Sequence, residues 1–196
     1  MPRQIYYNAA ESIARETAAD PYLRPSFPLS QQLRRVAWNL CWLLLYRPSP
    51  RPLHGWRSFL LRFFGAQMGP DCHFYPSSKV WAPWNLVCGD VVALADGAEI
   101  YNPWTVTLGS HSTISQQAYV CTASHDVDDP AFPMVGAPVT IGDHAWICAR
   151  AAVLPGVSLG PGAVLALGSI ATHDLAQWTL YAGAPARPMR ERKRHA

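Results

Sequence analysis

The seven histidines are the first residues to consider for chemistry, because imidazole titrates near neutral pH and can move a proton or bind a metal. One of them, His125, ends the stretch VCTASH and is followed, after Asp126, by the loop-like run VDDPAFPMVGAP. A histidine in such a place is often only an exposed loop residue. Its role therefore depends on the kind of pattern that it ends.

That pattern has a period of six after Gly65, which is neither the 3.6 of a helix nor the 2 of a simple strand. A fixed hexapeptide repeat is the sequence signature of a parallel β-helix. Glycine follows the apolar residue at every third step, and we expect glycine and small residues to fill the corners where the backbone turns. The fifteen apolar positions are Met68, Phe74, Val80, Cys88, Leu94, Ile100, Leu108, Ile114, Val120, Ile141, Ile147, Val153, Leu159, Leu165 and Ala171.

The repeat predicts a three-sided prism over residues 66–182, with three short strands per coil and one inward apolar side chain per strand. Coils stacked about 4.8 Å apart would satisfy one another's backbone groups as parallel sheets. One long loop, residues 126–137, interrupts the repeat directly after His125. Loops held on a rigid scaffold are where function tends to lie.

Two segments precede the repeat: a polar, proline-punctuated arm at residues 1–30 and a helical segment at residues 31–65. We expect its first helix to use Ser30 as the N-cap and to run to Tyr46. In the second helix the predicted core-facing stripe is Trp56, Phe59, Leu60 and Phe63, with Arg57 and Arg62 off it.

These helices could cap the main domain, or could lie on an anionic membrane surface as basic aromatic helices do. Peripheral membrane contact through residues 31–64 therefore stays open. The most apolar part, residues 36–46, is well short of the roughly 20 residues that span a bilayer.

The charge and the cysteines exclude other classes of protein. The net charge is only +3, and the basic residues gather at the chain ends, above all in the C-terminal segment 183–196, so no nucleic-acid partner is expected. The five cysteines are odd in number and form no CxxC pair, which indicates small buried side chains in a reducing compartment. The first thirty residues contain no apolar signal region. We therefore expect a cytoplasmic protein.

The repeat, the break after TASHD and the ending GAPARPMR together resemble the hexapeptide-repeat acyltransferases, whose fold is an all-β left-handed parallel β-helix. Within that family the sequence is most similar to the colanic-acid-type exopolysaccharide O-acetyltransferases. The similarity runs from Leu33 to about Arg192. The repeats alone leave function open, whereas the SHD and GAPAR elements are more specific.

The resemblance implies a homotrimer with acetyl-CoA as co-substrate in the groove between neighbouring prisms. The acceptor would be a saccharide, nucleotide-linked or lipid-linked. By position, His125 would be the general base that a hydroxyl nucleophile needs, and Asn102 and Asp126 would contact the acceptor. Six residues match positions near the co-substrate: Trp146, Ala149 and Leu167 along the pantetheine channel, and Thr172, Arg187 and Arg190 near the phosphates, which attract cations.

Two departures from the galactoside and maltose acetyltransferases lie on the acceptor side. Those enzymes have an asparagine where this chain has Ala95, and a proline where it has Asp126. The resemblance therefore says more about the acetyl donor than about the sugar that accepts the acetyl group.

Three alternatives stay open: N-acyl transfer to an amino sugar, a metal enzyme like the carbonic anhydrases of this fold, and a non-catalytic scaffold. Zinc needs several ligands at about 2.0–2.1 Å, and no second histidine follows His125 in its loop, so no metal is expected. We expect His111, His144 and His173 to be corner residues, and the aspartates 126, 128 and 129 to form a solvated loop rather than a calcium site.

Overall fold

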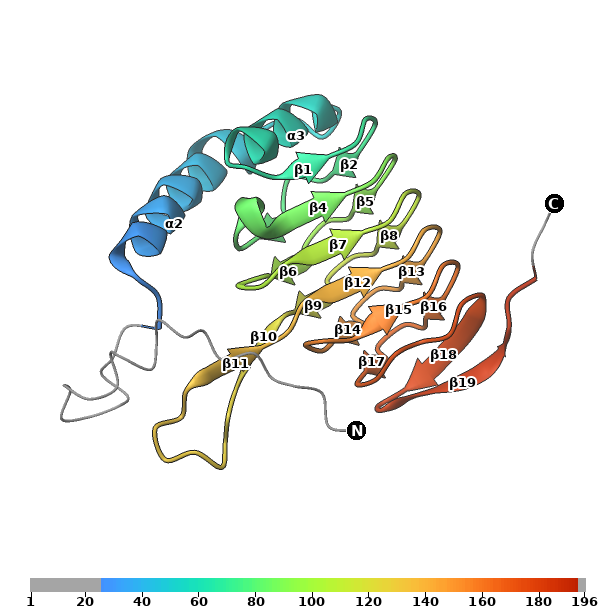
Figure 1. The fold of residues 1–196 in the computed structure, drawn as a ribbon. Helices are drawn as coiled ribbons and strands as arrows, with labels where there is room; N and C mark the ends of the chain where they lie inside the picture. The colour runs from blue at the N-terminus through green and yellow to red at the C-terminus, as the bar shows by residue number, and fades with distance from the viewer. Residues whose placement is uncertain (1–25, 194–196) are drawn as a thin grey trace.

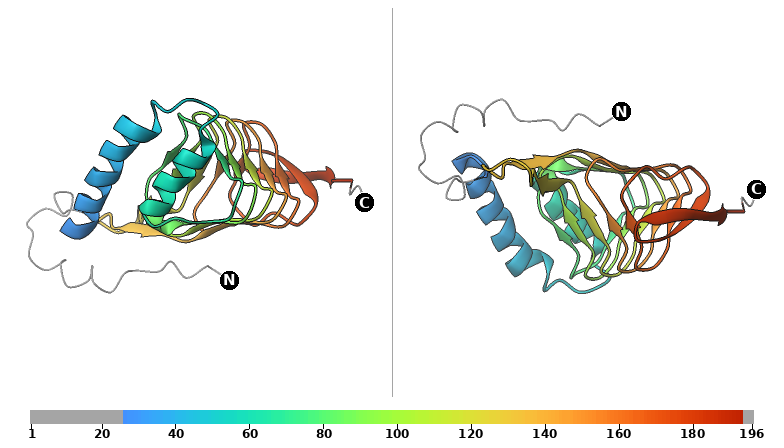
Figure 2. Two further views of the ribbon diagram at one scale, coloured as in Figure 1. Left: turned by 90° about the horizontal axis from the view of Figure 1, so that it is seen from above. Right: turned by 90° about the horizontal axis from the view of Figure 1, so that it is seen from below.

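Apolar residues six positions apart form the short strands of a parallel β-solenoid, as the sequence predicts (Figure 1). The computed structural model describes residues 26–193. Five coils stack along one axis, and two helices cover the N-terminal end (Figures 1 and 2). Residues 1–25, most of the expected polar arm, lie outside the described residues, as do residues 194–196.

Each face of the solenoid is a sheet built from every third strand of the coils. The first sheet contains β1 (Gln67–Met68), β4 (Leu86–Cys88), β7 (Val106–Leu108), β12 (Val139–Ile141) and β15 (Ser158–Leu159). The second contains β2 (His73–Phe74), β5 (Ala93–Leu94), β8 (Thr113–Ile114), β13 (Trp146–Ile147), β16 (Val164–Leu165), β18 (Thr179–Gly183) and β19 (Ala186–Glu191). The third contains β3 (Lys79–Val80), β6 (Glu99–Tyr101), β9 (Tyr119–Cys121), β14 (Ala152–Val153) and β17 (Ile170–Ala171).

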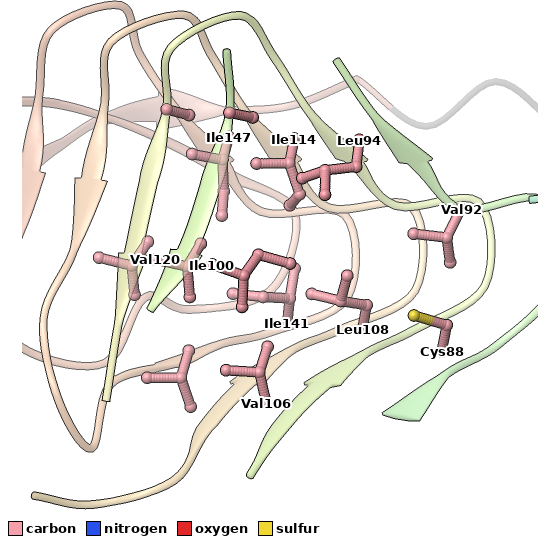
Figure 3. Close-up of a cluster of buried hydrophobic side chains, with 14 of the residues drawn as sticks. Cys88, Val92, Leu94, Ile100, Val106, Leu108, Ile114, Val120, Ile141 and Ile147 are labelled. Carbon is pink, nitrogen blue, oxygen red and sulfur yellow. The ribbon is translucent and has the colours of Figure 1, made fainter. Parts of the chain in front are cut away.

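The core is a set of apolar ladders inside the prism (Figure 3). Met68 is half-buried, and the other fourteen repeat positions are buried as predicted. Leu94 pairs with Ile114 and Ile114 with Ile147 in register, so each inward side chain stacks on its equivalent in the next coil. Burial of these side chains supplies the main favourable free energy of folding.

The repeated glycines begin the corner turns, as expected, and the close approach of neighbouring coils excludes a side chain there. A Cβ on Gly109 would lie 2.5 Å from the backbone nitrogen of Asp143 in the next coil. The left-handed corner conformation falls two residues later, on His111 and His144, with φ of 58° and 57°, and on Gly162, with φ of 67°. At these repeated glycine positions, the contact with the next coil is therefore what excludes a Cβ atom.

The first helix, α2 (Leu29–Cys41), continues as the π-helix η2 (Trp42–Tyr46). It ends where predicted, but it begins after Pro28 without any side-chain cap, so the assignment of Ser30 as N-cap is wrong. Trp38 and Trp42 donate their indole N–H groups to the carbonyls of Val80 and Ser78, at 2.7 and 2.9 Å. These carbonyls belong to the open edge at β3, which the helix thereby closes.

The second helix, α3 (His54–Phe63), buries a different face from the predicted one. Of the expected stripe only Leu60 is buried, whereas Trp56, Phe59 and Phe63 are exposed. The buried residues are Arg57, Ser58, Leu60 and Leu61. The helix is oriented by the unpaired carbonyls at the open end of the solenoid, which need hydrogen-bond donors more than apolar contact.

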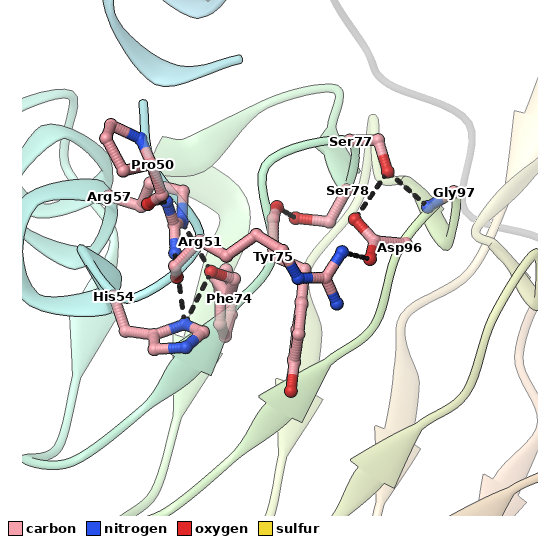
Figure 4. Close-up of polar contacts among 10 residues, drawn as sticks. All are labelled: Pro50, Arg51, His54, Arg57, Phe74, Tyr75, Ser77, Ser78, Asp96 and Gly97. Carbon is pink, nitrogen blue, oxygen red and sulfur yellow. Dashed lines mark hydrogen bonds and ion pairs between the residues drawn. The ribbon is translucent and has the colours of Figure 1, made fainter. Parts of the chain in front are cut away.

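Arg57 is the main donor at that end and is fully buried (Figure 4). Its Nε donates to the carbonyl of Phe74 on the edge strand β2, at 2.5 Å. Its terminal nitrogens donate to the Ser49 hydroxyl and to the carbonyls of Pro50 and Arg51, at 2.8, 2.9 and 2.5 Å. Burial lowers the pKa of this guanidinium below its usual value. The side chain thus ties the turn between the helices to the first coil.

The described part of the basic C-terminal segment, residues 183–193, contains a strand, β19. Its predicted boundary at residue 183 falls inside β18, and β19 pairs antiparallel with β18. Beyond the strand, Arg192 donates to the carbonyls of His144 and Gly162, at 2.9 and 3.2 Å. The basic segment therefore helps to close the last coil.

Replacement of Arg57 by methionine should leave several buried acceptors without donors. We expect Arg57→Met to lower the free energy of unfolding by about 3 kcal/mol, measured by urea denaturation. The exposed Arg47, whose guanidinium lies 5.5 Å from the Trp42 ring centroid, is the control; Arg47→Met should change stability by less than about 0.5 kcal/mol. Equal losses from both variants would contradict the capping role.

Candidate active site

The long insertion is a hairpin rather than a simple loop. Strand β10 (Ala123–His125) pairs antiparallel with β11 (Met134–Gly136), so Ala123 faces Gly136 and His125 faces Met134. The hairpin projects from the flank of the solenoid in Figure 1. The predicted loop 126–137 therefore ends in a strand, and His125 stands at the last pair before the chain turns.

His125 is half-buried and held in one orientation by the loop that follows it. Its Nδ1 lies 2.9 Å from the carbonyl oxygen of Phe132, and its ring stacks on the Phe132 ring with centroids 4.5 Å apart and planes 5° from parallel. Because a carbonyl can only accept, Nδ1 must carry the proton. In the neutral ring Nε2 then keeps its lone pair, which is the state that a general base requires.

The turn that presents the Phe132 carbonyl is fixed by its own backbone. Phe132 adopts the left-handed region at φ 44°, which is uncommon for a residue with a side chain. Its N–H donates to the carbonyl of Asp129 at 2.8 Å, and the N–H of Asp126 donates to the carbonyl of Pro133 at 3.0 Å. The carbonyl that accepts the hydrogen bond from His125 therefore belongs to a loop that is closed by its own backbone hydrogen bonds.

The base of the hairpin is tightly packed at Gly136. A Cβ at this position would collide with the Thr122 carbonyl and with the Trp104 ring. Thr122 is fully buried, and its hydroxyl accepts from the Trp104 N–H at 3.0 Å. The hairpin thus leaves the solenoid at a rigid point.

The structure does not place Asn102 where an acceptor could reach it. The residue is fully buried, its Oδ1 accepts from the Ala82 N–H at 2.9 Å, and its Nδ2 donates to the Ala82 carbonyl at 2.8 Å. The amide therefore pairs with a backbone peptide as a neighbouring strand would. This is a structural role and not the predicted acceptor contact.

Asp126 adjoins His125, but its carboxylate takes part in the local turn. Its Oδ1 accepts from the Asp128 N–H at 3.1 Å, as aspartates do when they stabilise turns. The side chain is half-buried. It lies in the right loop for an acceptor contact, with part of its surface open.

Three donor-side candidates gather along one corner of the prism. Trp146 on β13 is 45% exposed, and its indole donates to the Ser115 hydroxyl at 2.8 Å. Ala149 and Leu167 lie in successive turns between the second and third sheets, linked by the Gly168 N–H and the Ala149 carbonyl at 3.1 Å. Leu167 is 72% exposed. This corner is open to a ligand that runs along the solenoid axis.

His125 lies at the opposite end of the third sheet from that corner. It follows β9, whereas Ala149 precedes β14, and these two strands are paired parallel neighbours. Thr172 follows β17 and lies at the same end of the sheet as the hairpin. One chain therefore does not bring its histidine and its own Trp146 corner together.

Arg187 and Arg190 are exposed on β19, where they face Ala182 and Leu180 of β18. Arg190 also lines an open pocket of about 950 Å³ with four residues that the sequence did not single out as ligands: His144, Trp178, Arg192 and Lys193. His144 stacks on His111 with ring centroids 4.9 Å apart. Cationic and aromatic side chains in one pocket suit a nucleotide or another phosphate compound.

Sequence reasoning missed this pocket because its residues come from two different coils and from the C-terminal strand. His144 was expected to be only a corner residue, and Trp178 falls outside the six-residue period. The basic run RERKR was the available signal. The position of this run beside the pocket follows from the β18–β19 pairing, which the sequence does not reveal.

Thiol and metal chemistry find little support in the described part of the chain. All five cysteines are free, and burial raises the pKa of four of them, Cys41, Cys72, Cys88 and Cys148, away from the reactive thiolate. Among residues 26–193 no group of three or more histidines, cysteines and acidic residues is arranged to hold a metal ion.

Comparison with known proteins relates the chain to acetyltransferases. No protein-family model matches the chain. The chain is 37% identical over 155 residues to WcaF of Escherichia coli K12, which is named as a colanic acid biosynthesis acetyltransferase; the match covers 79% of this chain and 85% of that protein.

Two solved structures share the fold. A hexapeptide-repeat acetyltransferase of Vibrio cholerae, in complex with acetyl-CoA, superposes with a TM-score of 0.76 and 24% identity over 87% of this chain and 93% of that one. A galactoside acetyltransferase in complex with coenzyme A gives a TM-score of 0.73 and 22% identity over 85% of this chain and 84% of that one.

The Phe132 carbonyl should hold neutral His125 in the tautomer with the proton on Nδ1. In ¹⁵N NMR of the histidine-labelled protein, we expect a signal assigned by its loss in His125→Gln, with a pyrrole-like Nδ1 and a pyridine-like Nε2. His173, whose Nδ1 lies 3.1 Å from the Thr172 hydroxyl instead of a carbonyl, serves as comparison. A pyridine-like Nδ1 in His125 would contradict the proposed orientation.

Proposed function

Because the chain belongs to the hexapeptide-repeat acetyltransferase family, we propose that it is an acetyl-CoA-dependent O-acetyltransferase that modifies a sugar hydroxyl in exopolysaccharide biosynthesis. The observation that carries this proposal is the His125 imidazole, with Nδ1 bonded to the Phe132 carbonyl and Nε2 left as an acceptor. The name of the relative WcaF motivates the choice of an acceptor of the colanic-acid type.

In the proposed reaction, Nε2 of His125 accepts the proton of a sugar hydroxyl while the oxygen attacks the thioester carbonyl of acetyl-CoA. The C–S bond breaks, and the imidazolium returns its proton to the departing CoA sulfur. Positioned general bases contribute about 10²- to 10⁴-fold in rate. The carbonyl of Phe132 accepts from Nδ1–H throughout and holds the ring in the orientation that presents Nε2.

The donor site we propose is shared between copies in a homotrimer. His125 and the corner with Trp146, Ala149 and Leu167 lie at opposite ends of one sheet, so a complete site needs that corner from a neighbouring chain. The exposed Trp146 and Leu167 side chains would contact pantetheine. Thr172, Arg187 and Arg190 would lie toward the nucleotide, where arginines attract the phosphates.

On the acceptor side, Asp126 remains the side chain that we propose for sugar contact. Asn102 is withdrawn from this role, because both polar atoms of its amide bind Ala82. The acceptor would be a saccharide carried on a nucleotide or a lipid. The five free cysteines fit a reducing compartment, so we place the reaction in the cytoplasm.

Loss of the imidazole should remove the proton acceptor and leave the donor site intact. We expect His125→Ala to lower kcat by about 10²- to 10⁴-fold with little change in CoA affinity. His73→Ala, which alters an exposed histidine on β2, should keep normal turnover.

The measurement is acetyl-CoA turnover against saccharides, nucleotide sugars, polysaccharide repeat units and amino sugars. Normal acetyl transfer to a saccharide by His125→Ala would refute the proposed base. Turnover with amino sugars alone would assign N-acyl transfer instead.

Removal of the exposed indole at the donor corner should weaken co-substrate binding. We expect Trp146→Ala to raise the KM for acetyl-CoA roughly tenfold, because the apolar contact with pantetheine is lost. Trp56→Ala is the matched control: its indole is 38% exposed, against 45% for Trp146, but lies on α3. The same rise in both variants would contradict the assigned corner.

A further inference from the structure

The α2–η2 segment carries two apolar faces, and only one of them packs against the solenoid. Trp38 and Tyr46 are buried, and Trp42 is half-buried, on the inner face. Six large apolar side chains repeat at helical spacing on the outer side, each between 51% and 69% exposed: Leu29, Leu33, Val36, Leu40, Leu43 and Leu44. An ordinary surface helix would carry polar residues there.

A row of aromatic rings on α3 extends this exposed surface. Trp56, Phe59 and Phe63 are 38%, 53% and 75% exposed, and successive ring centroids lie 5.7 and 6.4 Å apart. The Trp56 indole donates to the carbonyl of Leu45 at 3.1 Å, which joins the row to η2. Both helices lie over the same end of the solenoid (Figure 2). We call these nine exposed side chains of α2, η2 and α3 the helical face.

The segment that carries the helical face contributes charge of one sign. Residues 29–65 contain six arginines and no aspartate or glutamate. Arg34, Arg47 and Arg62 are exposed, and within residues 26–193 only Arg51 of the six pairs with a carboxylate, that of Asp96 at 2.6 Å. The surface is therefore apolar in the middle and cationic among its neighbours, which complements a lipid surface with anionic headgroups.

We propose that the helical face binds the surface of an anionic lipid bilayer. Leucine and aromatic side chains would enter the boundary between headgroups and acyl chains, and the exposed Arg34, Arg47 and Arg62 would contact lipid phosphates. No helix in the described part of the chain is long and apolar enough to cross a bilayer. The contact is thus one that lies in the interface.

A second copy of the chain is the rival occupant of this face. Two copies joined through it would bring the same arginines together without carboxylates from residues 29–65 to neutralise them. Such like-charge contact is unfavourable at an interface. Lipid phosphate offers the missing negative charge. The charge of the helices therefore favours a lipid surface over a second copy of the chain.

The test is cosedimentation of the full-length protein with vesicles, which needs no catalysis. We expect binding to equimolar phosphatidylglycerol and phosphatidylcholine, much weaker binding to phosphatidylcholine alone, and release in about 1 M NaCl, where the Debye length is about 3 Å. Equal and salt-independent binding to both vesicle types, or binding to neither, would overturn the proposal.

The paired variant Leu40→Gln with Phe63→Gln removes two side chains that are 54% and 75% exposed and should not disturb folding. It should lower the vesicle partition coefficient roughly tenfold or more. Met189→Gln is the matched control, since Met189 is 65% exposed on β19 and should partition like the wild type. Light scattering of the same variants reports the oligomeric state. A smaller assembly for the paired variant with unchanged vesicle binding would overturn the proposal in favour of self-association.

Discussion

The in-register stacking of coils about 4.8 Å apart is the constraint on which the rest of the structure depends. It selects one inward apolar side chain per strand, as in the ladder of Leu94, Ile114 and Ile147. It also excludes any Cβ where Gly109 meets the next coil. Because every coil must fit its neighbour, extra residues can be accommodated only outside the prism. The β10–β11 hairpin is such an insertion, and it carries His125.

The same stacking leaves a row of carbonyls unpaired at the first coil, and the N-terminal helices are arranged to satisfy them. Trp38 and Trp42 serve the edge at β3, and Arg57 serves the edge at β2. The side chains that donate these hydrogen bonds therefore lie on the side of the helices that faces the solenoid. The leucines of α2 and the aromatic rings of α3 remain outside. The apolar face proposed for lipid follows from the need for hydrogen-bond donors at the end of the solenoid.

The sequence predicted those parts that depend on the repeat and missed those that depend on one contact between distant segments. The period of six gave the sheets, the core and the position of His125, because it reflects the stacking directly. It could not show that the Asn102 amide pairs with Ala82, a partner twenty residues away. Hydrophobic periodicity also failed on α3, where hydrogen bonds to carbonyls decide the buried face. The tautomer of His125 likewise depends on the Phe132 backbone, which no side-chain pattern reveals.

The central claim is that Nε2 of His125 receives the proton of the acceptor hydroxyl. The most direct measurement is a crystal structure of the protein with CoA and a saccharide that it acetylates. The account predicts a sugar hydroxyl oxygen within roughly 2.6–3.2 Å of Nε2, with the CoA sulfur beside it and Nδ1 still donating to the Phe132 carbonyl. A sugar and a sulfur bound together away from His125 would contradict it.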